Sequence, residues 1–162
     1  MNEIRLTPSQ ILQGANAGIL RQVQNIQKNR TPRFGVGSDK DWQLHVEGCL
    51  AELAVAQYFG IFWDANLGML SKGDVGLLEV RSTSHPTGRL ILHPSDKDES
   101  SYILVRGFNG SYKFAGWCFG HEAKQAHYWT EINNNKRPAY FYPNSELKPI
   151  DSIFLTTTKI AA

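Results

Sequence analysis

The charged residues of segment 73–83 have types and spacing that could bind a divalent cation. The segment reads GDVGLLEVRST, with Asp74 five residues before Glu79 and Arg81 two residues after it. Residues two apart in a strand share a face, so Glu79 and Arg81 should point the same way. Asp74 can reach the same place only if the chain bends, and Gly76 is the natural position for that bend. Two carboxylates brought together in this way suit a hard cation such as Mg²⁺.

A third carboxylate could come from the helix that precedes this segment. Residues 41–58 are expected to be helical, and Gly60 is expected to end the helix. At about 100° per residue, Glu52 falls at the rim of the apolar face, beside small residues that would let a strand backbone come close. Glu47 falls on the opposite rim, roughly 140° away. Glu52 is therefore preferred to Glu47 as the third acid.

The same spacing also occurs in ordinary surface hairpins. In that interpretation Glu79 and Arg81 form a same-face salt bridge that contributes little to stability. On spacing alone, the metal site is the less common of the two interpretations.

Two helices are expected to precede the strand that carries these residues. Residues 8–29 should form an amphipathic helix, because Thr7 can cap it, Pro8 occupies its first position and Gln10 completes a capping box. Its apolar residues recur at helical spacing; they are Leu12, Ala15, Ile19, Val23 and Ile26.

Short strands follow the second helix. The β-type runs are 77–83, 89–93, 102–106 and 111–119, with a short helix expected at 120–132. Segment 138–143 should be extended or an edge strand, because a proline stands at each end. A last short strand is expected at 153–157. The order predicts an α+β or mixed α/β single domain over 1–162, with a mostly antiparallel sheet. Its parts are an N-terminal helix at 8–29, a core at 41–120, and a C-terminal helix and tail at 121–162.

The composition is typical of a globular protein in a reducing compartment. The chain has 162 residues, 41% of them hydrophobic, and a formal charge of +2, which permits a nucleic-acid partner without requiring one. The two cysteines, Cys49 and Cys118, lack the spacing of a metal clip. No apolar run approaches the roughly 20 residues that span a bilayer. We therefore expect a cytoplasmic protein with no membrane partner, in the host cytoplasm if the protein is viral.

Segments 47–60 and 73–83 together resemble the PD-(D/E)XK nuclease superfamily, the restriction-endonuclease-like fold. The first is similar to the family's glutamate-bearing core helix, and the second to its Asp…Glu-x-Lys core hairpin. The resemblance covers roughly residues 44–106 and is closest to small phage and mobile-element members. It implies a mixed central sheet flanked by helices, here preceded by the N-terminal amphipathic helix.

The resemblance also implies Mg²⁺- or Mn²⁺-dependent hydrolysis of DNA phosphodiester bonds by an activated water. Carried over residue by residue, Asp74 and Glu79 would be metal ligands, and Glu52 a further ligand, directly or through water. Val80 would offer its backbone carbonyl. Arg81 stands where the family has a lysine.

Arg81 is a departure from the family pattern, and it leaves two functions open. Arginine stays protonated, so it can stabilise negative charge but cannot act as a base. Lys72 or Lys97 could replace the family lysine. The chain is then either a metal-dependent DNA nuclease or a catalytically weakened module that binds DNA or a host protein, such as a phage accessory or inhibitor protein. A third interpretation is a structural or assembly protein of a phage. A homodimer is compatible with the resemblance, although no feature of the sequence marks an interface.

Overall fold

The computed structural model describes residues 3–28, 40–65, 73–131 and 138–153. The helices are α1 (Pro8–Gln27), α2 (Asp41–Phe59) and the short α3 (Gly120–Ala123). The strands are β1 (Glu3–Arg5), β2 (Leu78–Thr83), β3 (Leu90–Leu92), β4 (Ser101–Phe108), β5 (Ser111–Phe119), β6 (Trp129–Thr130) and β7 (Ala139–Tyr142). Short 3₁₀ turns occur at Ala126–Tyr128, Asn144–Glu146 and Ile150–Ser152. No helix in these ranges is both long enough and apolar enough to cross a membrane.

Helix α1 begins as its capping residues predict, but its apolar stripe does not face the core. The Thr7 hydroxyl accepts from the Gln10 backbone, and the Gln10 side chain accepts from the Thr7 backbone. The face that packs on α2 carries small residues, among them Gly14 and Gly18. A Cβ atom at Gly18 would lie 2.5 Å from the Cα of Val46, so the two helix backbones pass too closely for a larger side chain.

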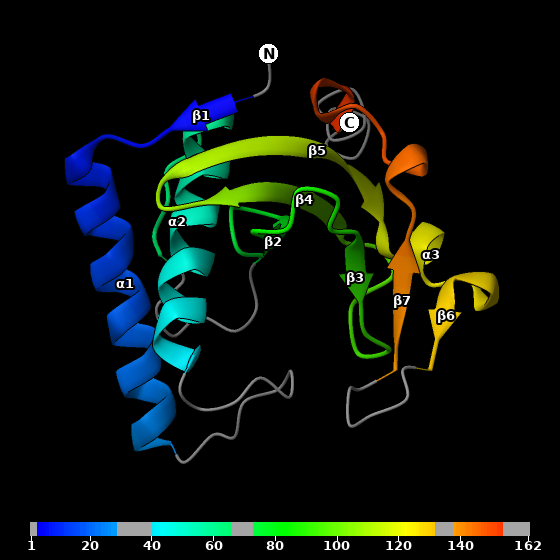
Figure 1. Cartoon of the computed structure of the whole chain (residues 1–162), viewed down its shortest axis with the longest axis horizontal. Coiled ribbons are helices and arrows are strands. Elements are labelled where there is room, and N and C mark those ends of the chain that lie inside the picture. Colours follow the sequence, from blue (N-terminus) through cyan, green and yellow to red (C-terminus); the bar gives the residue numbers. More distant parts are fainter. Residues whose placement is uncertain (1–2, 29–39, 66–72, 132–137, 154–162) are drawn as a thin grey trace.

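Helix α2 is enclosed on two sides. It ends at Gly60, which adopts the left-handed conformation with φ 65°, as the sequence predicts. All eight residues from Cys49 to Ala56 are buried, because α1 covers one side of the helix and the sheet covers the other (Figure 1). This buried middle part of the helix needs no polar face.

The larger sheet is mixed, with the strand order β1-β5-β4-β2. Strand β5 is antiparallel to both of its neighbours, β1 and β4, whereas the edge strand β2 runs parallel to β4. The prediction of a mostly antiparallel sheet is confirmed. A second, antiparallel sheet has the order β3-β7-β6. Strand β7 is therefore central: segment 138–143 contains an extended strand, as predicted, but that strand does not lie at an edge. Its two prolines lie just outside the strand and remove no ladder donor.

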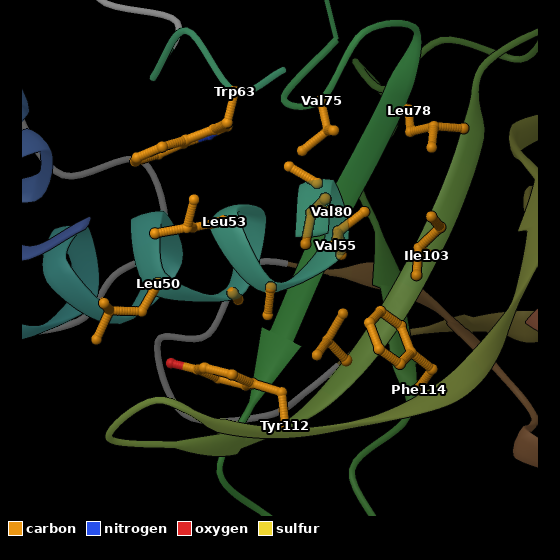
Figure 2. Packing of buried hydrophobic residues seen from close by; sticks show 14 of the residues in the cluster. Leu50, Leu53, Val55, Trp63, Val75, Leu78, Val80, Ile103, Tyr112 and Phe114 are labelled. Carbon is orange, nitrogen blue, oxygen red and sulfur yellow. The ribbon is translucent and has the colours of Figure 1, made fainter. Parts of the chain in front are cut away.

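The two faces of the larger sheet have separate cores. On strand β4, Ile103 and Val105 pack with α2, while Tyr102 and Leu104 pack with β3, β7 and α3 on the other face. Figure 2 shows the first core, in which residues of α2 meet β2, β4 and β5. The layers are therefore α1, α2, the larger sheet and the smaller sheet. The α+β class is confirmed, but the two long helices cover only one face of the mixed sheet rather than flanking it.

One helix and one strand differ from the sequence predictions. The predicted helix at 120–132 is only four residues long, because Trp129 and Thr130 pair with β7 instead. Strand β1, which was not predicted, pairs with β5. The strand predicted at 153–157 lies outside the described residues except for Ile153, which follows a 3₁₀ turn.

Candidate functional site

A tight turn brings Asp74 next to strand β2. Val75 and Leu78 exchange two backbone hydrogen bonds, of 3.1 and 2.9 Å, and Gly76 between them has φ 61°. The Asp74 carboxylate then accepts a hydrogen bond of 2.8 Å from the Val80 backbone N–H. The bend that the sequence required at Gly76 is therefore present, and it carries the Asp74 carboxylate back to the strand.

Strand β2 presents its charged residues on the face away from α2. Leu78 and Val80 are buried in the core beneath α2, as Figure 2 shows. Glu79 and Arg81 alternate with them and are half-buried on the opposite face. The Arg81 guanidinium lies over the ring of Tyr102 on the neighbouring strand, 5.1 Å from its centre.

The Arg81 guanidinium is the point where the predicted metal-binding groups converge. Its Nη1 lies 3.2 Å from the Val80 carbonyl oxygen, 3.8 Å from Asp74 Oδ2 and 3.9 Å from Glu79 Oε2. These are the three groups, apart from Glu52, that the family resemblance assigns to a divalent cation. In the structure these groups surround the positive charge of the Arg81 guanidinium rather than a metal ion.

A fourth oxygen group, Asp96, completes the surroundings of Arg81. Its Oδ1 lies 3.2 Å from Arg81 Nη2, and its Oδ2 accepts from the His93 backbone at 2.8 Å. The Lys124 ammonium holds this loop by donating to the carbonyls of Pro94 and Asp96 and pairing with Asp98 at 2.6 Å. Sequence analysis did not identify Asp96, because it is fifteen residues from Arg81 and no local spacing connects them.

The electrostatics of Glu79 reflect this cluster. Burial raises the pKa of the Glu79 carboxyl, and the negative charge of Asp74 raises it further. The positive charges of Arg81 and Lys97 lower the same pKa. The Lys97 backbone carbonyl accepts a hydrogen bond of 3.2 Å from the hydroxyl of Tyr102, which pairs with Glu79 across β2 and β4. Lys97 is one of the two alternatives that the sequence left for the missing lysine. The other, Lys72, lies outside the described residues.

Glu52 is not part of the cluster around Arg81. Its two carboxylate oxygens accept hydrogen bonds of 2.6 and 2.7 Å from Arg21 of α1, and the Trp63 indole donates to it at 3.2 Å. Arg21 also donates to the Ala65 carbonyl at 2.6 Å. Burial raises the pKa of Glu52 to about 7, while the Arg21 hydrogen bonds oppose the rise and Asp74 adds to it. Both carboxylate oxygens of Glu52 therefore accept hydrogen bonds from the guanidinium of Arg21 on α1.

The rejected alternative, Glu47, has a separate structural role. It accepts a hydrogen bond of 2.8 Å from the Tyr112 hydroxyl and two of 3.2 Å from the Asn109 backbone. It thus holds the tip of the β4–β5 hairpin. Arg21, which the sequence analysis overlooked, offered one signal: it is the sole charged residue between Pro8 and Gln27.

The donor atoms near Arg81 are of the kind that a hard cation uses. Two carboxylates and a backbone carbonyl, with water completing the shell, suit Mg²⁺ or Mn²⁺. Within the described ranges, however, no group of three or more His, Cys, Asp or Glu side chains is arranged to hold a metal ion. Arg81 supplies the positive charge that balances these acids in the present arrangement.

No protein-family model, no curated protein and no solved structure matches the chain at a significant level.

Proposed function

We propose that this chain hydrolyses DNA phosphodiester bonds with a divalent cation bound by Asp74, Glu79 and the Val80 carbonyl, in the manner of the PD-(D/E)XK nucleases. The observation that carries the proposal is the convergence of these three oxygen groups on Arg81 Nη1. A position that attracts one cation between two carboxylates and a carbonyl also suits Mg²⁺ or Mn²⁺. Such an ion polarises a phosphoryl oxygen and lowers the pKa of a bound water.

Arg81 and a divalent cation compete for the same oxygen atoms. Binding of the cation therefore requires the Arg81 guanidinium to turn away from Asp74 and Glu79. Its contact with Asp96 gives it a second anchor on the same side of the strand. From there its planar fork can bind the oxygens of a phosphate, although it cannot accept a proton from water.

Lys97 is the group that we assign to the attacking water. The backbone of Lys97 is bonded to Tyr102, the residue that pairs with Glu79 in the sheet, and the positive charge of Lys97 lowers the pKa of the Glu79 carboxyl. A lysine is a compact point charge that can orient a water, which the fixed fork of an arginine does poorly. In this proposal Lys97 takes the role of the family lysine from a different position in the chain.

Glu52 acts as a positioning residue in this proposal rather than as a ligand. It is bonded to Trp63, and Trp63 packs in the same core as Val75, the neighbour of Asp74 (Figure 2). The contact between α1 and α2 thereby supports the turn that presents Asp74.

A second candidate function is a nuclease-like module that binds DNA or a host protein without cutting. The observation in its favour is again Arg81, which already neutralises the acids that a nuclease would use for its cation. Under this alternative Arg81 is a permanent part of the structure and divalent cations do not bind here.

The test combines calorimetric titration with Mn²⁺ and cleavage of labelled single- and double-stranded DNA. Asp74→Asn and Glu79→Gln should abolish both binding and cleavage, whereas Glu99→Gln, an equal charge change at an exposed acid, should affect neither. Arg81→Ala should bind Mn²⁺ at least about tenfold more tightly, because a competing positive charge is removed. The same variant should cut DNA more slowly.

The outcomes separate the two candidates. Cleavage that depends on Asp74 and Glu79 supports the nuclease. A folded protein that binds DNA, cuts none and takes up no Mn²⁺ even as Arg81→Ala would exclude the nuclease and favour the binding module.

A further inference from the structure

The outward face of helix α1 is apolar, although no other described element covers it. Leu12, Ile19 and Ile26 recur at seven-residue intervals along this face, and they are 62%, 43% and 55% exposed. Leu20, on the flank of the same stripe, is 49% exposed. Figure 1 shows α1 at one side of the molecule, with α2 between it and the sheet. These four side chains are exposed, whereas Ile11 of the same helix packs against the core.

The same face carries no charge. The sole charged residue between Pro8 and Gln27 is Arg21, and its guanidinium turns inward to Glu52. Helices that lie on lipid surfaces carry lysine and arginine on their polar face, so a membrane is a poor match for α1. An uncharged apolar stripe can approach an identical stripe without electrostatic repulsion.

We propose that this face of α1 is a homodimer interface, in which α1 packs antiparallel against α1 of a second copy. The spacing supports a two-fold arrangement, because Ile19 lies seven residues from Leu12 and seven from Ile26. A two-fold axis at Ile19 places Leu12 opposite Ile26 of the second copy, and Ile19 opposite itself. Such an interface uses the same patch on both chains. A seven-residue repeat is also the spacing at which two helices pack side by side over several turns.

The area of the stripe predicts a dimer of moderate affinity. Helix α1 has twenty residues and is about 30 Å long. Its four exposed apolar side chains offer roughly 400 Å² per chain, the size of patch that on monomers is often functional. Two copies then bury about 800 Å² from these side chains, and the glutamine and asparagine residues beside them bring the total toward the roughly 1,200 Å² of small stable interfaces. We expect a dissociation constant on the order of 10 µM.

Sedimentation equilibrium of the full chain from about 1 to about 200 µM tests the proposal. The wild type should pass from monomer to dimer in this range. Ile19→Lys should remain monomeric, because it places two like charges at the two-fold axis. The matched control is Ile91→Lys on strand β3, a site 37% exposed on the other side of the molecule (Figure 1), and it should dimerise like the wild type. Circular dichroism establishes that each variant is folded.

A mixture of Ile19→Lys and Ile19→Glu chains provides the sharper test. Each variant alone should be monomeric, and the mixture should form a heterodimer because opposite charges now meet at the axis. A monomeric wild type at the highest concentration would overturn the proposal. So would an Ile19→Lys variant that still dimerises.

Cross-linking determines the direction of packing. Ile19→Cys should form an intermolecular disulfide when treated with diamide, because the two introduced thiols meet at the axis; the native Cys49 and Cys118 are both buried. Leu12→Cys alone should not cross-link, since its two copies would be about 20 Å apart. A mixture of Leu12→Cys and Ile26→Cys should cross-link. Efficient linkage of Leu12→Cys to itself would contradict the antiparallel arrangement.

Discussion

Replacing Arg21 with methionine should strongly destabilise the fold, and the effect should depend on pH. Arg21 donates hydrogen bonds of 2.6 and 2.7 Å to the two oxygens of Glu52, which is buried. Methionine keeps an apolar stem against α2 but leaves the Glu52 carboxylate without its cation. Removing one partner of a buried ion pair costs about 3–5 kcal/mol, because the remaining group must either stay charged without its partner or take up a proton. We expect the free energy of unfolding at neutral pH to fall by that amount.

The pH dependence follows from the protonation of Glu52. Burial raises its pKa to about 7 in the wild type, with Arg21 opposing the rise. A carboxyl with a higher pKa in the folded state binds more protons when folded, so its contribution to stability falls as pH rises between the unfolded and folded pKa values. Without Arg21 the pKa of Glu52 in the folded protein is higher still. In the variant alone, the free energy of unfolding therefore continues to fall as the pH rises above 7. The difference from wild type should then widen by up to about 1.4 kcal/mol per pH unit.

Urea unfolding, followed by circular dichroism at about pH 6 and about pH 8.5, measures both effects. The matched control is Arg5→Met, which removes an exposed arginine from a pair with Glu3 at 3.2 Å and should cost less than about 0.5 kcal/mol. Combining Arg21→Met with Glu52→Leu should recover most of the loss, since neither charge remains buried. A loss below about 1 kcal/mol at both pH values would refute the reasoning, because the pair would then not be desolvated.

Three further changes test close contacts, one between the two long helices and two around the candidate site. Gly18→Leu should cost about 3 kcal/mol or more in urea unfolding, because its Cβ would meet the Val46 backbone at 2.5 Å. Gly76→Val should lower stability by about 1–2 kcal/mol through its φ of 61° and should weaken Mn²⁺ binding in calorimetry by displacing Asp74; unchanged Mn²⁺ affinity would argue against Asp74 as a ligand. Lys124→Met should slow DNA cleavage by releasing the loop at 94–98, and a normal rate would show that this loop plays no part.

Local signals in the sequence predicted the helices well and their packing poorly. Thr7, Gln10 and Gly60 act within one helical turn, so the limits of α1 and α2 could be predicted to within a residue or two. Strand β1 has three residues and exists only through pairing with β5, more than a hundred residues later, so no local pattern indicates it. The apolar stripe of α1 indicates a helix but does not say which side meets α2. The close approach at Gly18 decides that question.

In the candidate site too, contacts between residues close in the sequence could be predicted, and contacts between distant residues could not. Asp74, Glu79 and Arg81 lie within eight positions, and the bend at Gly76 could be predicted from their spacing. The partner of Glu52 is thirty-one residues away on another helix, so nothing near Glu52 in the sequence points to Arg21. The metal and the nuclease activity remain predictions that the proposed experiments address.

The same contacts that gather the acids also shield the free edge of strand β2 from pairing with another chain. An edge strand with unpaired backbone groups invites addition of a further strand. At Leu78 both backbone groups are bonded to Val75, and at Val80 the N–H donates to Asp74 while the carbonyl accepts from Arg81. Substituting Asp74 would therefore expose part of this edge. Aggregation of such variants would then result from the exposed strand edge and not from the loss of a metal ligand.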